Sequence, residues 1–422
     1  MWFKQQPLNR DPWIPPWALA EIARTSIIYG TDFGRSEATY QDLIACFSAY
    51  SGYVDPELKA RQGLGGFLLR MGTEQLAMQQ DGYRDYARTA ALFVHTQMPP
   101  QHPAKAMTAG WDRALLAGTV VEYVAAAWLL EASTSVVANW GRFSLDWLSM
   151  PQFEPITTEV PADVLRTVIE QLYVADRDQL RQRQDDVQLR IGPVTPVFRR
   201  FAFNPLTSRP VVSGLHDELL IPVPKLIVRK ASPTGIYYEG LARCGTPFTT
   251  DLGHLFEAYI GRQLGLIDSA VVYPEINYGS HKSDLSVDWL VVFNDCVVLV
   301  EAKSCGPTEP IRLGSVNAAD AVEGKLGHGV EQLNKTAKLI RDHTPGFEAI
   351  PSDRPILGLV ATLDPFHNIN APLSGSLLPR FDIPYVVCCA HRKLSNGSSS
   401  MTRHPAQHSW RTSTTPTSGD GR

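Results

Sequence analysis

The chain has 422 residues, of which 44% are hydrophobic and 19% charged, and its formal net charge is -4 at pH 7. This is the composition of a soluble protein with cores for two or three domains, and it excludes a fibre, a disulfide-rich miniprotein and a wholly disordered chain. Because 39 Lys and Arg stand against 43 Asp and Glu, bulk charge gives no sign of a nucleic-acid partner. Such a partner must be argued from a local site.

The cysteine usage and the N-terminus favour a cytoplasmic location. The six cysteines form no CxxC pair and lack the density of a secreted scaffold. Residues 1–6 show no signal-peptide pattern. The most apolar stretch, 114–138, contains Glu122 and Glu131, and each carboxylate would cost about 2.5 kcal/mol or more inside a bilayer. We therefore expect a buried helix there and no membrane partner.

Residues 1–190 are predicted to form a mainly α-helical domain. Apolar residues recur at three- and four-residue spacing, and Pro pairs separate the helical stretches. The expected helices cover 17–28, 40–50, 64–76, 115–137 and 162–183. The charged run 176–186 is interpreted as a solvated helix face. Nothing in these residues indicates a role for the domain.

Residues 191–243 are predicted to be a Pro-rich extended or β connector. Short apolar runs at 219–221 and 226–228 suit strands. Between 197 and 230 there are six basic residues against two acidic ones. We consider two readings, scattered surface charge and a track for substrate phosphates. The candidate phosphate contacts of that track are Arg199, Arg200, Lys225, Arg229 and Lys230.

Residues 244–394 are predicted to form an α/β domain. The pattern gives a helix at 251–265, strands at 271–277, 285–293 and 296–304, a helix at 328–342, and strands at 355–363 and 383–390. The core order is thus α-β-β-β-α-β, a mixed sheet flanked by helices. The tail 395–422 is rich in Ser, Thr and Pro and is expected to be disordered.

Two apolar runs on either side of Asn294 and Asp295 predict a hairpin with a two-residue turn. This register places Phe293 opposite Cys296 and, counting outward, Asp288 opposite Glu301. Side chains alternate along a strand, so Lys303 shares their face. Directly opposed residues have Cβ atoms about 4.5–5.5 Å apart, at which distance two carboxylates repel each other. The pattern therefore predicts a divalent cation between Asp288 and Glu301, with Lys303 positioned to hold a water molecule.

These residues and their surroundings resemble the PD-(D/E)xK nuclease superfamily, which has the restriction-endonuclease-like fold. The resemblance covers about residues 244–392, and Val287 stands where the family has its Pro. It implies Mg²⁺-dependent hydrolysis of phosphodiesters, with Mn²⁺ able to substitute, and Asp288 and Glu301 as metal ligands. It also implies that Lys303 orients or activates the nucleophile, and that the substrate is DNA rather than RNA.

The flanking helices supply further candidates. Glu257 lies between Gly253 and Gly261 on a helix face without bulky side chains, so it can reach the metal directly or through water. Gln332, with Lys335 one turn on, is a candidate for contacting substrate phosphate or orienting the water at Lys303. Glu275 and Asp284 are alternatives that replace or assist Asp288. The chain has no HExxH motif and no GxxxxGK[ST] motif.

The sequence favours a metal-dependent nuclease whose N-terminal helical domain recognises the target, a protein partner or a second copy of the chain. The alternatives are a catalytically silent scaffold or nucleic-acid-binding protein and a metal enzyme acting on another phosphate ester. Residues 245–393 contain twelve Lys and Arg and seventeen Asp and Glu. A net charge of -5 in this segment predicts modest affinity for DNA unless basic residues elsewhere contribute.

Overall fold

The computed structural model describes residues 14–31, 38–53, 64–79, 82–136, 141–192, 194, 196–279, 284–313, 317–371 and 383–389. The predicted disordered tail, 395–422, lies outside these residues. The helices are α2 Pro16–Tyr29, α3 Tyr40–Ser51, α4 Leu64–Gln75, α5 Gly82–Phe93, α6 Trp111–Leu116, α7 Val120–Val136, α8 Glu154–Thr157, α9 Ala162–Val168, α10 Arg177–Ile191, α11 Pro224–Ala231, α12 Pro233–Cys244, α13 Thr246–Leu264, α14 Glu309–Leu313, α15 Ala318–Val322 and α16 His328–Arg341. The strands are β1 Arg142–Phe143, β2 Val174–Ala175, β3 Val211–Val212, β4 Leu219–Leu220, β5 Val271–Pro274, β6 Asn277–Tyr278, β7 Asp284–Leu285, β8 Trp289–Val292, β9 Val297–Lys303, β10 Ile356–Thr362 and β11 Tyr385–Cys389.

The largest sheet has five strands in the order β11-β10-β9-β8-β5. Strands β5, β8 and β9 are antiparallel neighbours, whereas β9, β10 and β11 run parallel. Parallel neighbours need a long crossover, and the segment containing α14, α15 and α16 provides it between β9 and β10. The mixed sheet and the order of its elements agree with the predicted fold class.

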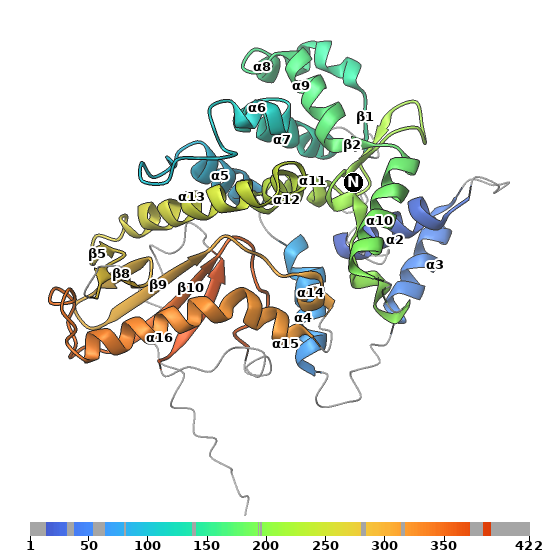
Figure 1. Ribbon diagram of the computed structural model, residues 1–422. Coiled ribbons are helices and arrows are strands. Elements are labelled where there is room, and N and C mark those ends of the chain that lie inside the picture. Colours follow the sequence, from blue (N-terminus) through green and yellow to red (C-terminus); the bar gives the residue numbers. More distant parts are fainter. Residues whose placement is uncertain are drawn as a thin grey trace, which may run out of the picture.

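Helices cover both faces of this sheet, with α13 on one side and α16 on the other (Figure 1). Alternation along the strands explains the two layers. Val291, Val298 and Val300 belong to the core that contains α13. Leu290, Val297 and Leu299 belong to the core that contains α16. A hairpin that is apolar on both faces thus occupies the middle of the sheet, as its sequence predicts.

Three of the predicted N-terminal helices are confirmed as α2, α3 and α4. The expected helix 115–137 is divided, because Ala117 adopts a left-handed conformation with φ 57° between α6 and α7. The single helix expected over 162–183 is wrong. Its middle is extended, because β2 pairs with β3 in a four-stranded sheet, and Asp176 then caps the start of α10 by accepting a hydrogen bond from Gln179 N at 2.8 Å.

The predicted extended connector 191–243 is largely helical. Leu219–Leu220 is a strand as expected, but the apolar run at 226–228 lies inside α11. The reason is that Pro224 occupies the first turn of this helix, where its missing N–H costs nothing. α11 packs against α5, α7 and α12. The segment is therefore part of the protein core.

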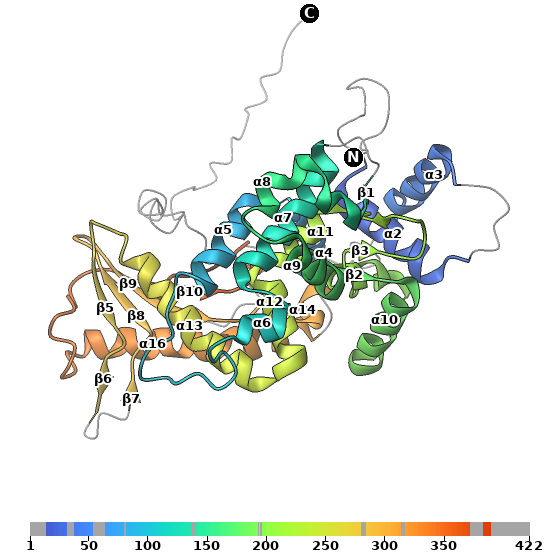
Figure 2. The ribbon, with the colours of Figure 1, turned by 90° about the horizontal axis from the view of Figure 1, so that it is seen from above.

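One hydrophobic core joins the helical part to the sheet. It includes Tyr86 and Leu130 from the N-terminal helices, Ile227 from α11, and Phe256 and Val300 from the α/β part. Figure 2 shows the sheet at one end of the molecule and α2 and α3 at the other, with α5, α7, α11 and α12 between them. The predicted boundaries at 190 and 243 thus do not separate independent cores.

The helical stretch Trp111–Thr134 is long and apolar enough to cross a membrane by length and composition alone. A core helix passes the same test. Tyr123, Ala126 and Leu130 on this stretch are completely buried against the rest of the protein.

Candidate active site

The hairpin register predicted from the sequence is confirmed. Trp289 pairs with Val300 and Val292 with Val297, and Phe293 N donates a hydrogen bond to Cys296 O at 2.9 Å. One step beyond the last pair, Asp288 stands beside the end of β9. Its Oδ2 accepts a hydrogen bond from Ala302 N at 2.6 Å. The structure thus brings Asp288 next to Glu301 and Lys303.

Glu301 and Lys303 form an ion pair, with Lys303 Nζ 2.7 Å from Glu301 Oε1. The Glu301 side chain is only 5% exposed. Its other oxygen, Oε2, is buried and has no hydrogen-bond partner among the described residues. A buried carboxylate oxygen without a donor is costly. It is the kind of atom that a cation or a water bound to a cation satisfies.

Helix α16 approaches this pair closely because residue 329 is glycine. A Cβ at Gly329 would lie 2.9 Å from Lys303 Cε and 3.1 Å from Glu301 Cγ. Two turns further along the same helix, the hydroxyl of Thr336 accepts a hydrogen bond from Val287 N at 3.1 Å. Gln332 is half-buried between these two positions, and spacings of three and four residues place all three on one helix face. This face covers Asp288 and Glu301.

Glu257 reaches the same region from the opposite layer. Trp289 Nε1 donates a hydrogen bond to Glu257 O at 3.1 Å, and a Cβ at Gly261 would lie 2.0 Å from the Trp289 ring. The glycine therefore lets α13 lie directly on β8. Gly253, the other small residue, leaves ordinary contact distance to Ser304 Oγ, 3.7 Å from an added Cβ.

Burial raises the pKa of every carboxyl in this cluster, and repulsion by neighbouring carboxylates adds to the rise at Glu301 and Glu257. Burial, followed by the charge of Asp288, raises the pKa of Glu301 to about 8. Burial and then Asp288 and Glu275 raise the pKa of Glu257 to about 7. Burial also raises the pKa of Asp288, although the Ala302 N–H and Lys303 oppose the rise. The cluster therefore retains a proton near neutral pH unless another positive charge replaces it.

The same repulsion places Glu275 near the site. Burial and the charge of Asp288 raise its pKa. Asp284, the other alternative, is exposed on β7, where it pairs with Tyr278. Lys335 is also exposed, and its Nζ lies 5.4 Å from the Tyr278 ring centroid.

No group of three or more His, Cys, Asp or Glu side chains in the described ranges is close enough to hold a metal ion by itself. Mg²⁺ does not need such a cage, because it keeps several waters and takes one or two carboxylates together with substrate phosphates. Asp288 and Glu301, with the unsatisfied Oε2, fit this smaller set of ligands. Glu257 and Glu275 lie near enough to Asp288 for its charge to raise their pKa values.

Three of the five residues of the predicted phosphate track over 197–230 have acidic partners within the chain. Arg200 Nη2 lies 2.8 Å from Glu74 Oε2, and Arg229 Nη2 lies 3.2 Å from Asp364 Oδ2. Lys230 is 2% exposed and forms an ion pair with Glu239. These partners are distant in sequence or on another helix, so the local charge count did not reveal them. Lys225 lies 4.0 Å from Glu131, and Arg199 is exposed.

Gly329 and Thr336 were not predicted from the sequence. The pattern that could have identified them is their spacing from Gln332. It places a glycine, a glutamine and a threonine on one helix face, where a core helix otherwise carries large apolar residues. Both residues are explained by what they touch, the Lys303 stem and the Val287 backbone.

The chain matches no protein-family model, no curated protein and no solved structure. A function is therefore inferred from the geometry of the site.

Proposed function

We propose that the chain is a metal-dependent nuclease that hydrolyses phosphodiester bonds, with DNA as its substrate and Mg²⁺ as its cofactor. The observation that carries the proposal is the unpartnered, buried Oε2 of Glu301. It lies in a cluster with Asp288 and with a lysine that neutralises only the other oxygen. The α-β-β-β-α-β order and the resemblance of Asp288, Glu301 and Lys303 to the PD-(D/E)xK motif support it.

In this proposal Asp288 and Glu301 are the metal ligands. Bound Mg²⁺ would supply the positive charge that stabilises the phosphate oxygens and acidifies a water. The Ala302 N–H fixes the orientation of Asp288. Lys303 binds and orients the attacking water. Burial lowers the pKa of Lys303, but the carboxylates of Glu301 and Asp288 raise it by more, so the lysine stays cationic. Glu257 and Gln332, from the two covering helices, would contact water molecules bound in the site.

The test is cleavage of plasmid and single-stranded DNA with Mg²⁺, Mn²⁺ or EDTA. We expect nicking that requires the metal and is lost in Asp288→Ala and Lys303→Ala. Asp268→Ala and Lys338→Ala are matched controls, because both side chains are exposed and neither is a candidate of the site, and both should cleave as the wild type does. Equal cleavage by Asp288→Ala and wild type would refute the proposal.

The internal ion pair between Lys303 and Glu301 favours a second candidate, a silent nucleic-acid-binding or scaffold protein. In such a protein the lysine replaces the metal. The two candidates differ in the effect of Mg²⁺ on the melting temperature. A rise in the wild type that Asp288→Ala lacks supports the metal enzyme, and absence of any rise together with absence of cleavage supports the scaffold.

A further inference from the structure

A charged cavity lies between helices α2 and α4 and the segment 200–207. Its volume is about 100 Å³. Four arginines, Arg70, Arg200, Arg229 and Arg312, are on its wall, against the two carboxylates of Glu21 and Glu74. None of the ligands proposed for the metal lines it. The cavity is therefore a separate feature whose wall carries more arginines than carboxylates.

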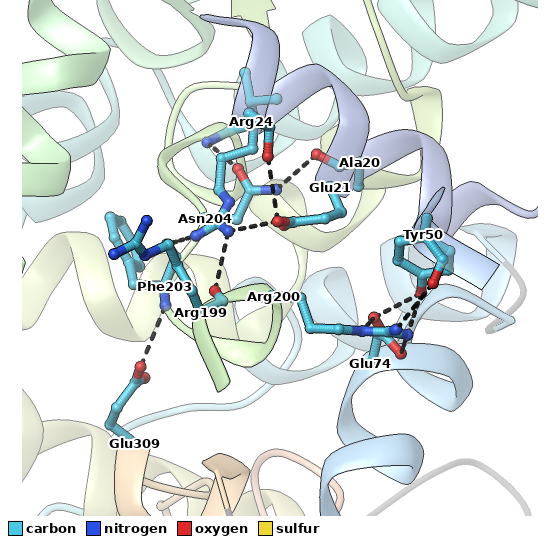
Figure 3. A network of polar contacts seen from close by, with 12 residues as sticks. Ala20, Glu21, Arg24, Tyr50, Glu74, Arg199, Arg200, Phe203, Asn204 and Glu309 are labelled. Carbon is cyan, nitrogen blue, oxygen red and sulfur yellow. Dashed lines mark hydrogen bonds and ion pairs between the residues drawn. The ribbon is translucent and has the colours of Figure 1, made fainter. Parts of the chain in front are cut away.

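Both carboxylates of the wall are already engaged by guanidinium groups (Figure 3). Glu74 accepts hydrogen bonds from Arg200 at 2.8 and 3.0 Å and from the hydroxyl of Tyr50 at 2.7 Å. Glu21 accepts one at 2.6 Å from Arg24, which is buried beside the cavity. Two ion pairs thus cancel both negative charges of the wall. Of the other arginines of the wall, Arg229 and Arg312 form ion pairs with Asp364 and Glu309, which lie outside it.

Arg229 and Arg312 keep unused donors. Their ion pairs with Asp364 and Glu309 each run through a single terminal nitrogen, Nη2, whereas a guanidinium carries five N–H donors. Asp364 and Glu309 do not line the cavity. Moreover, Arg312 Nε is buried and finds no acceptor within the described part of the chain. A buried charged donor of this kind requires a partner.

Size and rigidity favour a small anion as that partner. A water molecule needs a cavity volume of about 10–15 Å³. The volume of about 100 Å³ therefore accepts several waters or one small polyatomic anion. Arg70 is held in place by a hydrogen bond to Leu313 O at 2.8 Å and by the Phe198 ring, whose centroid is 4.7 Å from Cζ. Planar guanidinium groups match the oxygens of a phosphate in a fork geometry.

We propose that this cavity binds a phosphate group, free or as the monoester of a small molecule such as a mononucleotide, with Arg229 and Arg312 as its main ligands. The site is distinct from the proposed nuclease centre and needs no metal. It is connected to that centre through Asp364, which follows β10. Asp364 N donates a hydrogen bond to Cys305 O at 3.1 Å, two residues after Lys303.

Calorimetric titration of the whole chain in EDTA tests the proposal, with inorganic phosphate, 5′-AMP and adenosine as probes and chloride at matched ionic strength. We expect phosphate and 5′-AMP to bind with a Kd of about 1 mM or tighter and adenosine not to bind. Tighter binding of 5′-AMP than of phosphate would identify a nucleotide site, and equal binding a site for phosphate alone. No binding of either probe would overturn the proposal.

Variants locate the binding. Arg312→Gln should weaken phosphate binding at least about tenfold, the loss of charge-assisted hydrogen bonds. Arg243→Gln makes the same charge change on α12, outside the cavity wall, where the side chain is 42% exposed, and should change nothing. Ala77→Met should fill the cavity and leave every ion pair intact. It therefore tests whether phosphate binds in the cavity even if Arg312→Gln does not fold. Unchanged binding in folded Ala77→Met would overturn the proposal. Asp288→Ala should bind as the wild type does, whether or not the chain is a nuclease.

Discussion

The hydroxyl of Thr336 on α16 accepts a hydrogen bond from the backbone nitrogen of Val287, the residue directly before Asp288, at 3.1 Å. Thr336 is 1% exposed and Val287 is completely buried. The bond therefore satisfies a buried donor and fixes the backbone from which the Asp288 carboxylate projects. A threonine outside the cluster of charged residues positions one of its members.

Replacing Thr336 by Val, which has nearly the same shape, should leave the Val287 N–H buried without an acceptor. We expect a loss of about 1–3 kcal/mol in the free energy of unfolding, measured by urea denaturation, and slower DNA cleavage. Thr336→Ser keeps the hydroxyl and should retain more of both. Equal stability of Thr336→Val and wild type would show that the bond contributes nothing.

Gly329→Ala should impair the site directly. The added Cβ would lie 2.9 Å from Lys303 Cε and 3.1 Å from Glu301 Cγ, so the lysine must move. We expect the overpacking to cost about 1–3 kcal/mol, offset by up to about 1 kcal/mol of better helix propensity, and cleavage to fall about tenfold or more. Gly324→Ala is the control, because an added Cβ there meets no atom within 4 Å. Similar cleavage rates for the two variants would contradict the close approach of α16.

The raised pKa values predict how stability depends on pH. The pKa of Glu301 rises from its ordinary value of 4.5 to about 8 on burial, so the folded chain holds more protons than the unfolded chain between these values. The stabilisation that protonated Glu301 gives the folded chain is complete below pH 4.5 and is lost as the pH rises through about 8. Without metal, stability should therefore fall over this range.

Glu301→Gln should reduce this fall in the free energy of unfolding with rising pH by at least about 1.4 kcal/mol, which is the free energy of one pKa unit. Chemical denaturation at a series of pH values in EDTA measures it. In the wild type, Mg²⁺ should raise the melting temperature more at pH 8.5 than at 6.5, since the metal binds ionised carboxylates. A stability of the wild type that rises with pH over this range would contradict the assignment.

The paired basic residues should matter for stability and not for DNA. Arg200→Gln leaves the Glu74 carboxylate, 8% exposed, without its main partner, and breaking a buried pair costs about 3–5 kcal/mol. We expect this loss in urea denaturation, with DNA affinity and its salt dependence unchanged under conditions where the variant is folded. Arg199→Gln, at an exposed position, is the comparison for stability and should be neutral. A reduced salt slope for Arg200→Gln would restore the phosphate track.

Local patterns predicted how Asp288, Glu301 and Lys303 are arranged. The turn residues Asn294 and Asp295 and the two apolar runs fix the hairpin register, so Asp288, Glu301 and Lys303 follow from counting along two adjacent strands. Their alternation also assigns the layers on each face. These relationships extend over few residues, within which side-chain direction and hydrogen bonding obey simple rules.

Partners that are distant in sequence were not predictable in this way. Arg200 pairs with Glu74, and Arg229 with Asp364, and nothing near any of these residues announces the other. The helix expected over 162–183 failed for a related reason: β2 is extended because it pairs with β3, more than thirty residues later. Tertiary pairing overrides local propensity at such places.

The core shared by the helices and the sheet has a consequence for how the chain can be divided. Phe256 and Ile260 of α13 pack in the same cluster as Leu130 of α7 and Ile227 of α11. A fragment that starts at residue 244 would expose this apolar layer of α13 to water. Thermal unfolding of the whole chain should accordingly show one cooperative transition for helices and sheet together, and the sheet excised by itself should aggregate.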